Sequence, residues 1–393
     1  MATDSAPVTP EVLRWARETV GATLDDAATR AGVTEARIQA WESGEAEPTL
    51  AKLRALAKLY QRPLSVFFLP EAPTTFDAMR DFRRLPGAAD HSWSRALHKV
   101  YRRAIDQQAV AVELMEADDE IPQSAIPEAA IQDPPEDAAR TARRALGVNL
   151  AHQFSWRMPD ESFAGWMEAV EAAGVFVLRT SEVPFEEMRG FSVSSGHIPV
   201  IVVNALDWPR GQVFTLLHEV AHLMLREGGL CDLLEPDSGQ GRQIEAWCNA
   251  VAAAILMPAS SFLDNEVIRP PGRREWDDEV LAQLSGRWGV SREAILRRLV
   301  TLERATMDFY LEKRAEYQAA YAERREEERL RRKQSESKGG PPPYRMTVRD
   351  RGKPYVRLVL DAYQRDLITP SSLSTLLALK LKHLANLEHE VRS

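Results

Sequence analysis

The chain has 393 residues, of which 44% are hydrophobic and 27% are charged, a composition typical of globular proteins. At about 150 residues per domain, a chain of this length is expected to form two or three domains rather than a single one. The formal net charge of −8 excludes a basic field over the whole molecule, so any nucleic-acid contact must come from a local patch. No apolar run approaches the roughly 20 residues of a membrane-spanning helix, and the N-terminus lacks a secretory pattern, so we expect a soluble cytoplasmic protein.

Two cysteines occur, Cys231 and Cys248, which are too few for a disulfide framework. We expect both to be unpaired thiols, as in a reducing compartment. No segment repeats at a fixed period, which excludes solenoid and propeller architectures. The chain is therefore expected to fold around ordinary hydrophobic cores.

Short helices are predicted between residues 10 and 68, before the proline-spaced segment LPEAPTTF. Thr23 and Asp26 form a capping-box pattern at the start of one helix, and Gly32 allows the turn that follows it. Thr34 can cap the next helix. Two short helices joined in this way are the arrangement of a helix-turn-helix motif.

The second helix of this pair, from Thr34 to Gly44, has the pattern of a recognition helix. Ile38 and Trp41 supply its buried face, which leaves the opposite face for the major groove of double-stranded DNA. The candidate DNA-contacting residues are Thr34, Glu35, Arg37 and Gln39.

The charge of this region limits the DNA affinity that we expect. Residues 1–70 contain eight Lys plus Arg and nine Asp plus Glu, a net charge of −1. Tight non-specific DNA binding depends on neutralised phosphates, so docking to another protein, such as a related repressor, remains the alternative. The basic segment at 93–105 also has two interpretations, a solvated helix face or a DNA contact.

A helical stretch is expected next, from about Ser92 to Asp118. The segment PQSAIPEAAIQDPPED at 122–137 contains four prolines, which break regular structure and predict a loop or linker. Another helix is predicted to begin near Glu136.

The pattern then changes from helical to extended. GVFVLRT at 174–180 and HIPVIVVN at 197–204 are short segments rich in β-branched residues, which predicts two strands. Helices are expected again from Asp207 to Thr306.

The C-terminal part begins with a highly charged stretch. Ten of the 11 residues from Glu323 to Lys333 carry charges of both signs, which favours a solvated helix. SESKGGPPP at 335–343 predicts a flexible linker. The last 50 residues are then expected to form a small unit with a candidate strand at YVRLVL and a helix from Ser371 onward.

The segment VFTLLHEVAHLML at 213–225 carries the clearest chemical pattern. Residues four apart share a helix face, so His218 and His222 can direct two imidazoles at one metal ion. Glu219 lies beside them and can take a proton from the attacking water, which is the chemistry of an H-E-x-x-H motif. Apart from Thr215 these are the only polar residues of the run, so the helix should be buried and the carboxylate needs a compensating cation. The alternative is that the two histidines are ordinary core residues with hydrogen-bonded rings and bind no metal.

A hydrolytic zinc site usually takes a third protein ligand and leaves a fourth position for water. Glu245 is the acidic residue of the next apolar helix, QIEAWCNAVAAAILMP, and we predict it to be that ligand. Asn249 could hydrogen-bond to a ligand and hold it in place, or it could have a purely structural role. Cys248 is either an alternative ligand or a small residue that packs between two helices. The preceding loop holds three competing carboxylates that we expect to be solvated: Asp232, Glu235 and Asp237.

The run IVVNALDWPRGQVFTLLHEVAHLML, followed by IEAWCNAVAAAILMP, resembles the ImmA/IrrE metallopeptidases. The shared pattern is a strand ending in Asn, an aromatic-Thr pair before H-E-x-x-H, and then Glu and Asn ahead of an alanine-rich helix ending in Leu-Met-Pro. The resemblance extends to about residue 305 and implies a zinc-dependent endopeptidase whose relatives cleave helix-turn-helix repressors in stress responses or mobile elements. It implies zinc ligation by His218, His222 and Glu245, with Glu219 as the base.

Residues 10 to 68 resemble the XRE family of helix-turn-helix domains, especially through AWESGEAEPT and PLSVFFLP. DFRRLPG at 81–87 also resembles the connector of proteins that fuse these two modules. The combination of these two modules implies a DNA-binding domain joined to a peptidase domain.

The predicted fold class is α+β and mostly helical, with an N-terminal five-helix helix-turn-helix domain, a central zincin-like α+β metallopeptidase domain and a small C-terminal unit. The predicted boundaries are a helix-turn-helix domain at 8–70, a connector with a long helix at 71–135, the metallopeptidase domain at 136–306, a charged helix and linker at 307–343, and the C-terminal unit at 344–393.

The predicted function is that of a DNA-binding regulator with a Zn²⁺-dependent endopeptidase domain that cleaves a repressor protein. The strand at 197–204 is the candidate edge strand to hold an extended substrate past the metal. The alternatives are a non-proteolytic regulator whose zincin domain senses a ligand or metal, and a toxin-antitoxin component. We expect no membrane partner; the sequence leaves the oligomeric state open, with a homodimer as one candidate.

Overall fold

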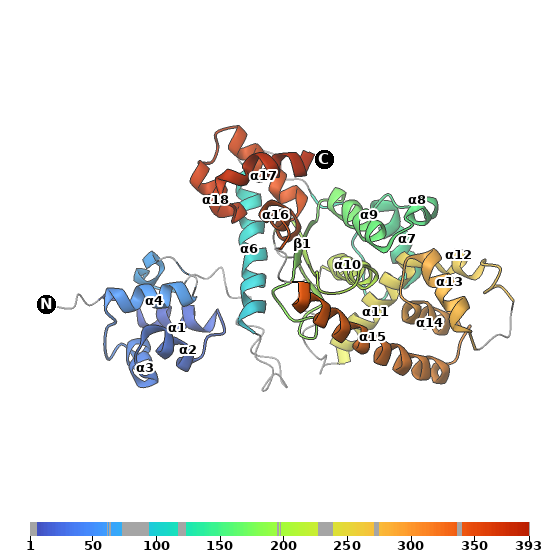
Figure 1. Ribbon diagram of the computed structural model, residues 1–393, viewed down its shortest axis with the longest axis horizontal. Helices are drawn as coiled ribbons and strands as arrows, with labels where there is room; N and C mark the ends of the chain where they lie inside the picture. Colours follow the sequence, from blue (N-terminus) through green and yellow to red (C-terminus); the bar gives the residue numbers. More distant parts are fainter. Residues whose placement is uncertain are drawn as a thin grey trace. The chain divides into compact units, whose positions relative to one another are not determined.

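The computed structural model describes residues 6–60, 62, 64–72, 94–116, 123–194, 196, 198–226, 239–270, 275–335 and 340–392. It divides the chain into two compact units, Met1–Arg103 and Ala104–Ser393. The described residues are mostly helical with one small sheet (Figure 1), so the predicted α+β, mostly helical class is confirmed. The predicted domain boundaries stay predictions, and the predicted connector motif at 81–87 lies outside the described residues.

Between residues 6 and 72, the described part of the first unit contains four short α-helices and one 3-10 helix, in line with the predicted five-helix domain. Its helices are α1 (Pro10–Glu18), α2 (Leu24–Ala31), α3 (Glu35–Ser43), α4 (Leu50–Tyr60) and η1 (Leu64–Phe68). Ile38 and Trp41 of α3 are buried in its core, as predicted from their spacing. The amphipathic pattern of each short helix therefore converges on one small hydrophobic centre.

The capping box that opens α2 forms as its sequence predicts. The Thr23 hydroxyl accepts a hydrogen bond of 3.1 Å from the Asp26 backbone N–H, and the Thr23 N–H donates one of 3.0 Å to the Asp26 carboxylate. Gly32 ends α2 with a φ of 63°, a left-handed conformation that a glycine adopts without strain. Thr34 occupies the N-cap position of α3, but its side chain makes no capping hydrogen bond, so the predicted cap is wrong in this detail.

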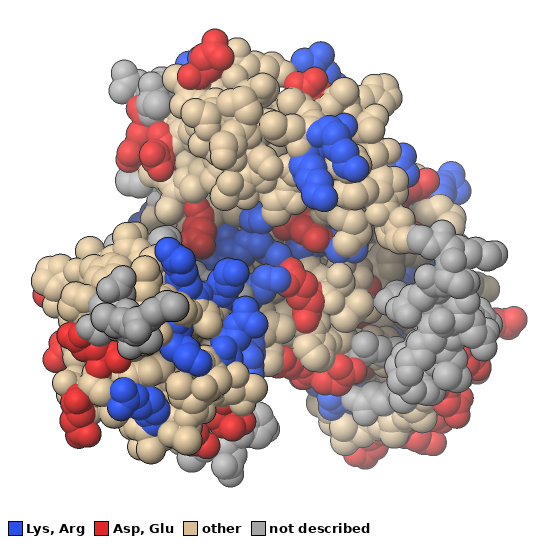
Figure 2. Space-filling view, turned by 60° about the vertical axis from the view of Figure 1, so that its left-hand side comes forward, with Lys and Arg blue, Asp and Glu red and all other residues tan. Residues whose placement is uncertain are grey.

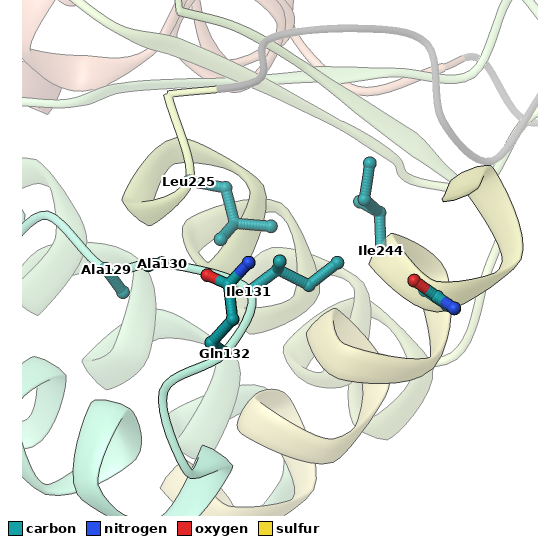
Figure 3. Close-up of a pocket in the computed structure, with 7 residues that line it drawn as sticks. Ala129, Ala130, Ile131, Gln132, Leu225 and Ile244 are labelled. Carbon is teal, nitrogen blue, oxygen red and sulfur yellow. The ribbon is translucent and has the colours of Figure 1, made fainter.

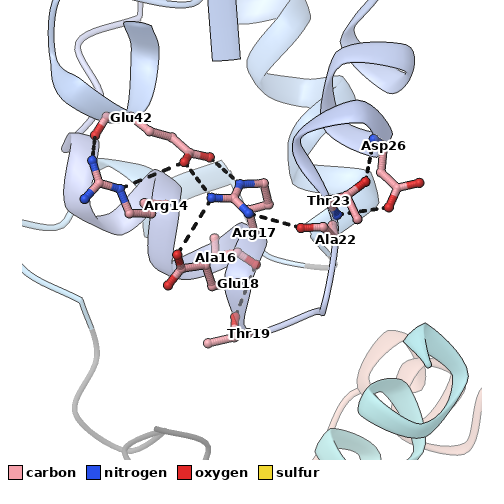
Figure 4. A network of polar contacts seen from close by, with 9 residues as sticks. All are labelled: Arg14, Ala16, Arg17, Glu18, Thr19, Ala22, Thr23, Asp26 and Glu42. Atoms are coloured by element: carbon pink, nitrogen blue, oxygen red, sulfur yellow. Dashed lines mark hydrogen bonds and ion pairs between the residues drawn. The ribbon is translucent and has the colours of Figure 1, made fainter. Parts of the chain in front are cut away.

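A buried ion pair joins α1 to α3 (Figure 4). Glu42 is 4% exposed, and its two carboxylate oxygens accept hydrogen bonds of 2.7 and 2.8 Å from Arg17. Arg14 donates another bond of 2.8 Å to the Glu42 carbonyl oxygen. Because a buried carboxylate is costly without a partner, this bidentate pairing sets how α3 sits against α1.

The second unit contains a sheet of three short strands in the order β1-β3-β2. The strands are β1 (Phe176–Thr180), β2 (Gly190–Val193) and β3 (Val200–Asn204). β1 runs parallel to β3, and β2 runs antiparallel to it. The predicted strands at 174–180 and 197–204 are confirmed, whereas β2 was not predicted. The prediction that 197–204 is an edge strand is wrong, because β3 pairs on both sides and β2 lies at the edge.

Helices pack around this sheet to form the main core. α9 (Pro159–Ala172) and α10 (Pro209–Met224) contact the sheet and each other, and α11 (Gly239–Leu256) packs between α10 and α7 (Pro135–Ala145). Residues Gln212, Val213 and Thr215 to Met224 of α10 are all buried, as the nearly continuous apolar run predicts. The motif helix is therefore the central helix of this core (Figure 1).

The second unit contains several further helices. They are α8 (Leu150–Ser155), α12 (Ala259–Leu263), α13 (Asp278–Trp288), α14 (Arg292–Thr301) and the long charged α15 (Met307–Ser335). α6 (Arg95–Glu116) crosses from the first unit into the second. Residues 123–134 form no helix or strand, as the prolines predict.

The C-terminal segment is entirely helical. It comprises α16 (Pro343–Arg351), α17 (Lys353–Gln364), α18 (Pro370–Leu377), η5 (Leu381–His383) and α19 (Leu384–Arg392). The predicted strand at YVRLVL is wrong, because Tyr355, Val356, Val359 and Leu360 are buried together with the spacing of a helix face. α16 lies against β1, and Gly352 approaches so closely that an added Cβ would lie 2.6 Å from the Val177 carbonyl oxygen.

Within the described ranges, no helix combines the length and apolarity needed to span a bilayer. The face of the molecule seen in Figure 2 carries charged side chains of both signs.

Candidate metal centre

The two histidines of α10 point at one location, as residues four apart on a helix do. Their Nε2 atoms are 2.9 Å apart, and the rings meet edge to face with centroids 4.7 Å apart. Both side chains are almost completely buried, His218 at 2% and His222 at 0% exposure. Phe214, one turn before His218, stacks on its ring. The imidazoles are therefore held in place by packing on the helix that carries them.

Glu245 reaches the same location from α11. One carboxylate oxygen lies 3.3 Å from the His218 Nε2, and the other lies 3.4 Å from the His222 Nε2. Burial by itself would raise the pKa of Glu245, but the contacts with His218 and His222 outweigh it and lower the pKa to about 2. The carboxylate is thus ionised at any physiological pH, which is the state that binds a cation.

These three residues form the one group within the described part of the chain whose donor atoms could hold a metal ion. Their donor atoms all lie within 4.8 Å of one another. A tetrahedral zinc ion with bonds of about 2.0–2.1 Å separates its ligand atoms by roughly 3.3 Å, so the observed nitrogen-to-oxygen spacing fits zinc. The donor set of two imidazoles and one carboxylate is also a known catalytic set for that metal.

Glu219 occupies a different side of α10 from the two imidazoles. It is 1% exposed and faces β2, where a Cβ added to Gly190 would lie 3.6 Å from the Glu219 Cγ and 2.4 Å from the Thr215 Cγ2. Only a glycine permits β2 to come this close to α10. The candidate base is therefore enclosed between the motif helix and the edge strand.

Cys248 is a functional candidate that sequence reasoning assigned only as an alternative ligand. It is fully buried, and its Sγ lies 3.4 Å from the Nδ1 of His222, on the side of the ring away from Glu245. A partner for the second ring nitrogen fixes the tautomer and orientation of a ligating histidine. The sequence signal for this contact was that Cys248 follows Glu245 by three residues, which places the two side chains on the same face of the helix.

Asn249 lies next to Cys248 on α11, and its side chain is exposed. Among the described residues no side-chain hydrogen bond joins Asn249 to the three ligand candidates, and its supporting role stays a prediction. Cys231 and the three loop carboxylates at 232, 235 and 237 lie outside the described residues.

The four candidate DNA-contacting residues are all exposed to solvent. Ile38 turns inward from α3, and the side chains on the other side of the helix are open to solvent. The exposed candidates are Thr34, Glu35, Arg37 and Gln39.

The fold and the site together define a helix-turn-helix protein with a candidate metal centre on the H-E-x-x-H helix of an α+β domain. Residues 13–67 match the family model described as helix-turn-helix, and residues 170–300 match the IrrE N-terminal-like domain. The chain thus contains a helix-turn-helix domain joined to an ImmA/IrrE-type domain, which confirms the resemblance seen in the motifs.

Two curated proteins are similar to parts of this chain, and both are called radiation response metalloprotease IrrE. The protein from Deinococcus deserti is 30% identical over 168 residues, which cover 41% of this chain and 55% of the relative. The protein from Deinococcus radiodurans is 38% identical over 104 residues, which cover 25% of this chain and 29% of the relative. The chain therefore spans about half or less of the length of these relatives.

Proposed function

We propose that this protein is a DNA-binding regulator whose central domain is a zinc-dependent endopeptidase that cleaves a repressor protein. The observation that carries the proposal is the convergence of His218, His222 and Glu245 on one location, with the buried Glu219 next to His218 in the motif helix. The match to the IrrE-like domain and the names of the two relatives support a metalloprotease.

The residues around the site have separable tasks in peptide hydrolysis. His218, His222 and Glu245 would hold zinc, which when bound supplies Lewis-acid polarisation of the scissile carbonyl group. Glu219 takes a proton from the attacking water and returns it to the leaving amine. Glu219 is 1% exposed and lies close to Gly190, so its carboxylate is shielded from bulk water.

An extended substrate strand would lie along β2. This strand is paired on one side by β3 and is the sheet edge nearest Glu219. A peptide that adds to such an edge uses backbone hydrogen bonds, which suit many sequences. β2 therefore takes the role that was predicted for residues 197–204.

The N-terminal domain supports a regulatory setting for this activity. α3 presents Glu35, Arg37 and Gln39 to solvent, and the Arg17–Glu42 pair holds α3 against α1. A domain of this kind reads double-stranded DNA and supports a cytoplasmic location. Binding near a promoter would raise the local concentration of the peptidase around a repressor bound there.

The test is co-expression of the full chain with the repressors encoded beside its gene. We expect one of these repressors to be cut, and the cut to disappear in Glu219→Gln while the zinc content stays near one per chain. Glu168→Gln, at an exposed position of α9, is the matched control and should leave the cut unchanged.

Two results would overturn the proposal. Intact repressors in every combination, together with specific DNA binding by the chain, would favour a regulator without peptidase activity. A cut that persists in Glu219→Gln, or after zinc is removed by a chelator, would exclude this site as its source.

A further inference from the structure

The edge strand β2 carries one buried hydroxyl group, that of Ser192. This residue is 1% exposed, and its Oγ has no hydrogen-bond partner among the described residues. A buried hydroxyl without a partner destabilises the folded state, and an alanine at the same position would avoid this cost. The stability of the fold therefore does not explain why a serine occupies this position.

The pairing of the strands shows which way the Ser192 side chain points. Ser192 pairs with Ile201 of β3, and directly paired residues point to the same face of a sheet. Ile201 belongs to the hydrophobic core that also contains the apolar residues of α10. The Ser192 hydroxyl therefore lies on the face of the sheet that is covered by the motif helix.

The neighbours of Ser192 on this face define its level along α10. Residues two apart in an extended segment share a face, so Gly190, Ser192 and Ser194 all face the helix. A Cβ added to Gly190 would lie 3.6 Å from the Glu219 Cγ, and the Ser194 hydroxyl lies 3.5 Å from the Arg226 carbonyl oxygen. Ser192 is about 7 Å along the strand from each neighbour, so it faces the turn of α10 that begins at Glu219.

This turn of α10 offers few polar groups. From Glu219 to Leu223, only Glu219 and His222 have polar side chains. Both ring nitrogens of His222 already face other groups, since Nε2 lies 3.4 Å from Glu245 and Nδ1 lies 3.4 Å from Cys248. The carboxylate of Glu219 is therefore the side-chain group of this turn that a hydroxyl on β2 would meet.

The cavity at the end of α10 does not provide another environment for this hydroxyl. Its volume is about 480 Å³, and the side chains of Ile131, Leu225 and Ile244 lie around it (Figure 3). None of the residues that line this cavity belongs to β2. Ser192 thus faces the motif helix and not this cavity.

A hydroxyl group beside a carboxylate base can hold that base in position. It donates a hydrogen bond to one carboxylate oxygen and leaves the other oxygen to take the proton of the attacking water. Hydrogen bonds of this kind are often long before the substrate binds and shorten in the reacting complex. In the proposed mechanism the substrate lies along β2, which is the strand that carries Ser192.

We propose that Ser192 is a positioning residue that donates a hydrogen bond to the Glu219 carboxylate when a substrate lies along β2. The inference rests on the proposed peptidase function, because that function assigns Glu219 as the base. It adds a residue of the edge strand to the site, and it explains why a buried serine is kept at this position.

The first test measures binding of acetohydroxamate to the full chain loaded with zinc. This probe chelates zinc and shares the proton of its hydroxyl group with a carboxylate base beside the metal. Ser192→Ala should weaken its binding roughly 10-fold, because the Glu219 carboxylate is no longer held in position. In the Glu219→Gln background the same substitution should have no effect, since Ser192 acts through that carboxylate.

The second test compares catalysis with stability, and it uses the repressor that the chain cuts. Ser192→Ala should lower kcat roughly 10- to 100-fold and leave KM within about twofold of the parent value. Its melting temperature should stay unchanged or rise, since the substitution removes a buried hydroxyl that lacks a partner among the described residues. Ser192→Thr keeps the hydroxyl and should recover most of kcat. Ser162→Ala, at a buried serine of α9, is the matched control and should keep the parent kcat.

The outcomes separate this inference from the proposed function. A Ser192→Ala chain that binds acetohydroxamate and cuts the repressor as well as the parent does would overturn the role of Ser192 alone. An equal loss of affinity in the Glu219→Gln background would also overturn it, because Ser192 would then not act through Glu219. If the zinc-loaded parent binds no acetohydroxamate and cuts no repressor, the peptidase proposal fails, and the role of Ser192 fails with it.

Discussion

At the scale of single residues, the site depends on which atoms face the metal position and which lie behind it. Glu245 places a carboxylate oxygen near each imidazole, whereas Cys248 touches His222 at its other ring nitrogen. The two residues are three positions apart on α11, so one helix contributes a candidate ligand and a group that contacts another candidate ligand. Removal of either side chain should lower metal affinity. Loss of Glu245 would remove a ligand atom, whereas loss of Cys248 would remove the contact to the Nδ1 atom of His222.

We expect Cys248→Ala to lower zinc affinity by roughly 10- to 100-fold, because the His222 ring loses the partner that fixes its orientation. Cys248→Ser keeps a polar atom at this position and should remain close to the unmodified chain. Competition with a chelator at constant pH measures the affinity of each variant. Equal affinities for the Ala and Ser variants would show that the thiol only fills space.

At the scale of elements, β2 must lie very close to α10. An added Cβ at residue 190 would lie 2.4 Å from the Thr215 Cγ2 and 3.0 Å from the Val202 carbonyl oxygen. The fit between strand and helix is thus set by a missing side chain on one and a branched side chain on the other. In the proposed mechanism, catalysis by Glu219 would depend on this spacing because the substrate would lie along the same strand.

Gly190→Ala should lower the free energy of unfolding by about 1–3 kcal/mol through overpacking, and should reduce the rate of cleavage. The double variant Gly190→Ala with Thr215→Ser removes the closest atom and should recover part of both losses. Chemical denaturation and the rate of repressor cleavage provide the two measurements. A single variant as stable and active as the original would refute the close contact.

The position of α3, the predicted recognition helix, depends on the buried Arg17–Glu42 pair. The hydrogen bond that Arg17 donates to the Glu42 carboxylate raises the pKa of Arg17, which remains charged inside the domain. Glu42→Gln should therefore lower the free energy of unfolding of the N-terminal domain by roughly 3 kcal/mol, since the buried guanidinium loses its counter-charge.

Glu18→Gln is the matched control for this pair. Glu18 lies 3.8 Å from Arg17 but is 37% exposed, so its loss should change stability by no more than about 0.5 kcal/mol. Thermal unfolding of the N-terminal domain and DNA binding would both be followed. Similar effects of the two substitutions would rule out a special role for the buried pair.

At the scale of the whole molecule, one buried carboxyl makes stability depend on pH. Burial raises the pKa of Glu171 on α9 from 4.5 to about 8, although the charges of Arg357 and Lys353 on α17 lower it in part. Its Oε1 is buried without a hydrogen-bond partner among the described residues. The folded chain therefore keeps a proton that the unfolded chain releases.

The sign of the effect follows from this difference. The favourable contribution of protonated Glu171 is complete below pH 4.5 and is lost as pH rises toward about 8. Glu171→Gln should make the free energy of unfolding flatter across this range, while Asp308→Asn, at an exposed position of α15 that does not contribute to the shift of Glu171, should not. Denaturant titrations at several pH values test this, and parallel pH profiles of all three chains would contradict it.

Much of the first unit and of the motif helix follows from local sequence. A capping box, an apolar stripe and a histidine pair four residues apart depend on neighbours within one or two turns, so Thr23, Ile38 and His218 could be placed in advance. The strand β2 could not, since a four-residue segment with a glycine becomes a strand only when a distant partner pairs with it.

By itself, then, the sequence determined the class of fold, the helix-turn-helix domain and the helix that carries the H-E-x-x-H motif. Only the tertiary structure decided that β2 rather than β3 forms the edge, that YVRLVL is a helix, and that Cys248 contacts the Nδ1 atom of His222. The physical reason is the sequence separation of the residues that interact. A helix is specified by residues a few positions apart, whereas the order of strands and the way two helices pack are set by contacts between segments far apart in the sequence.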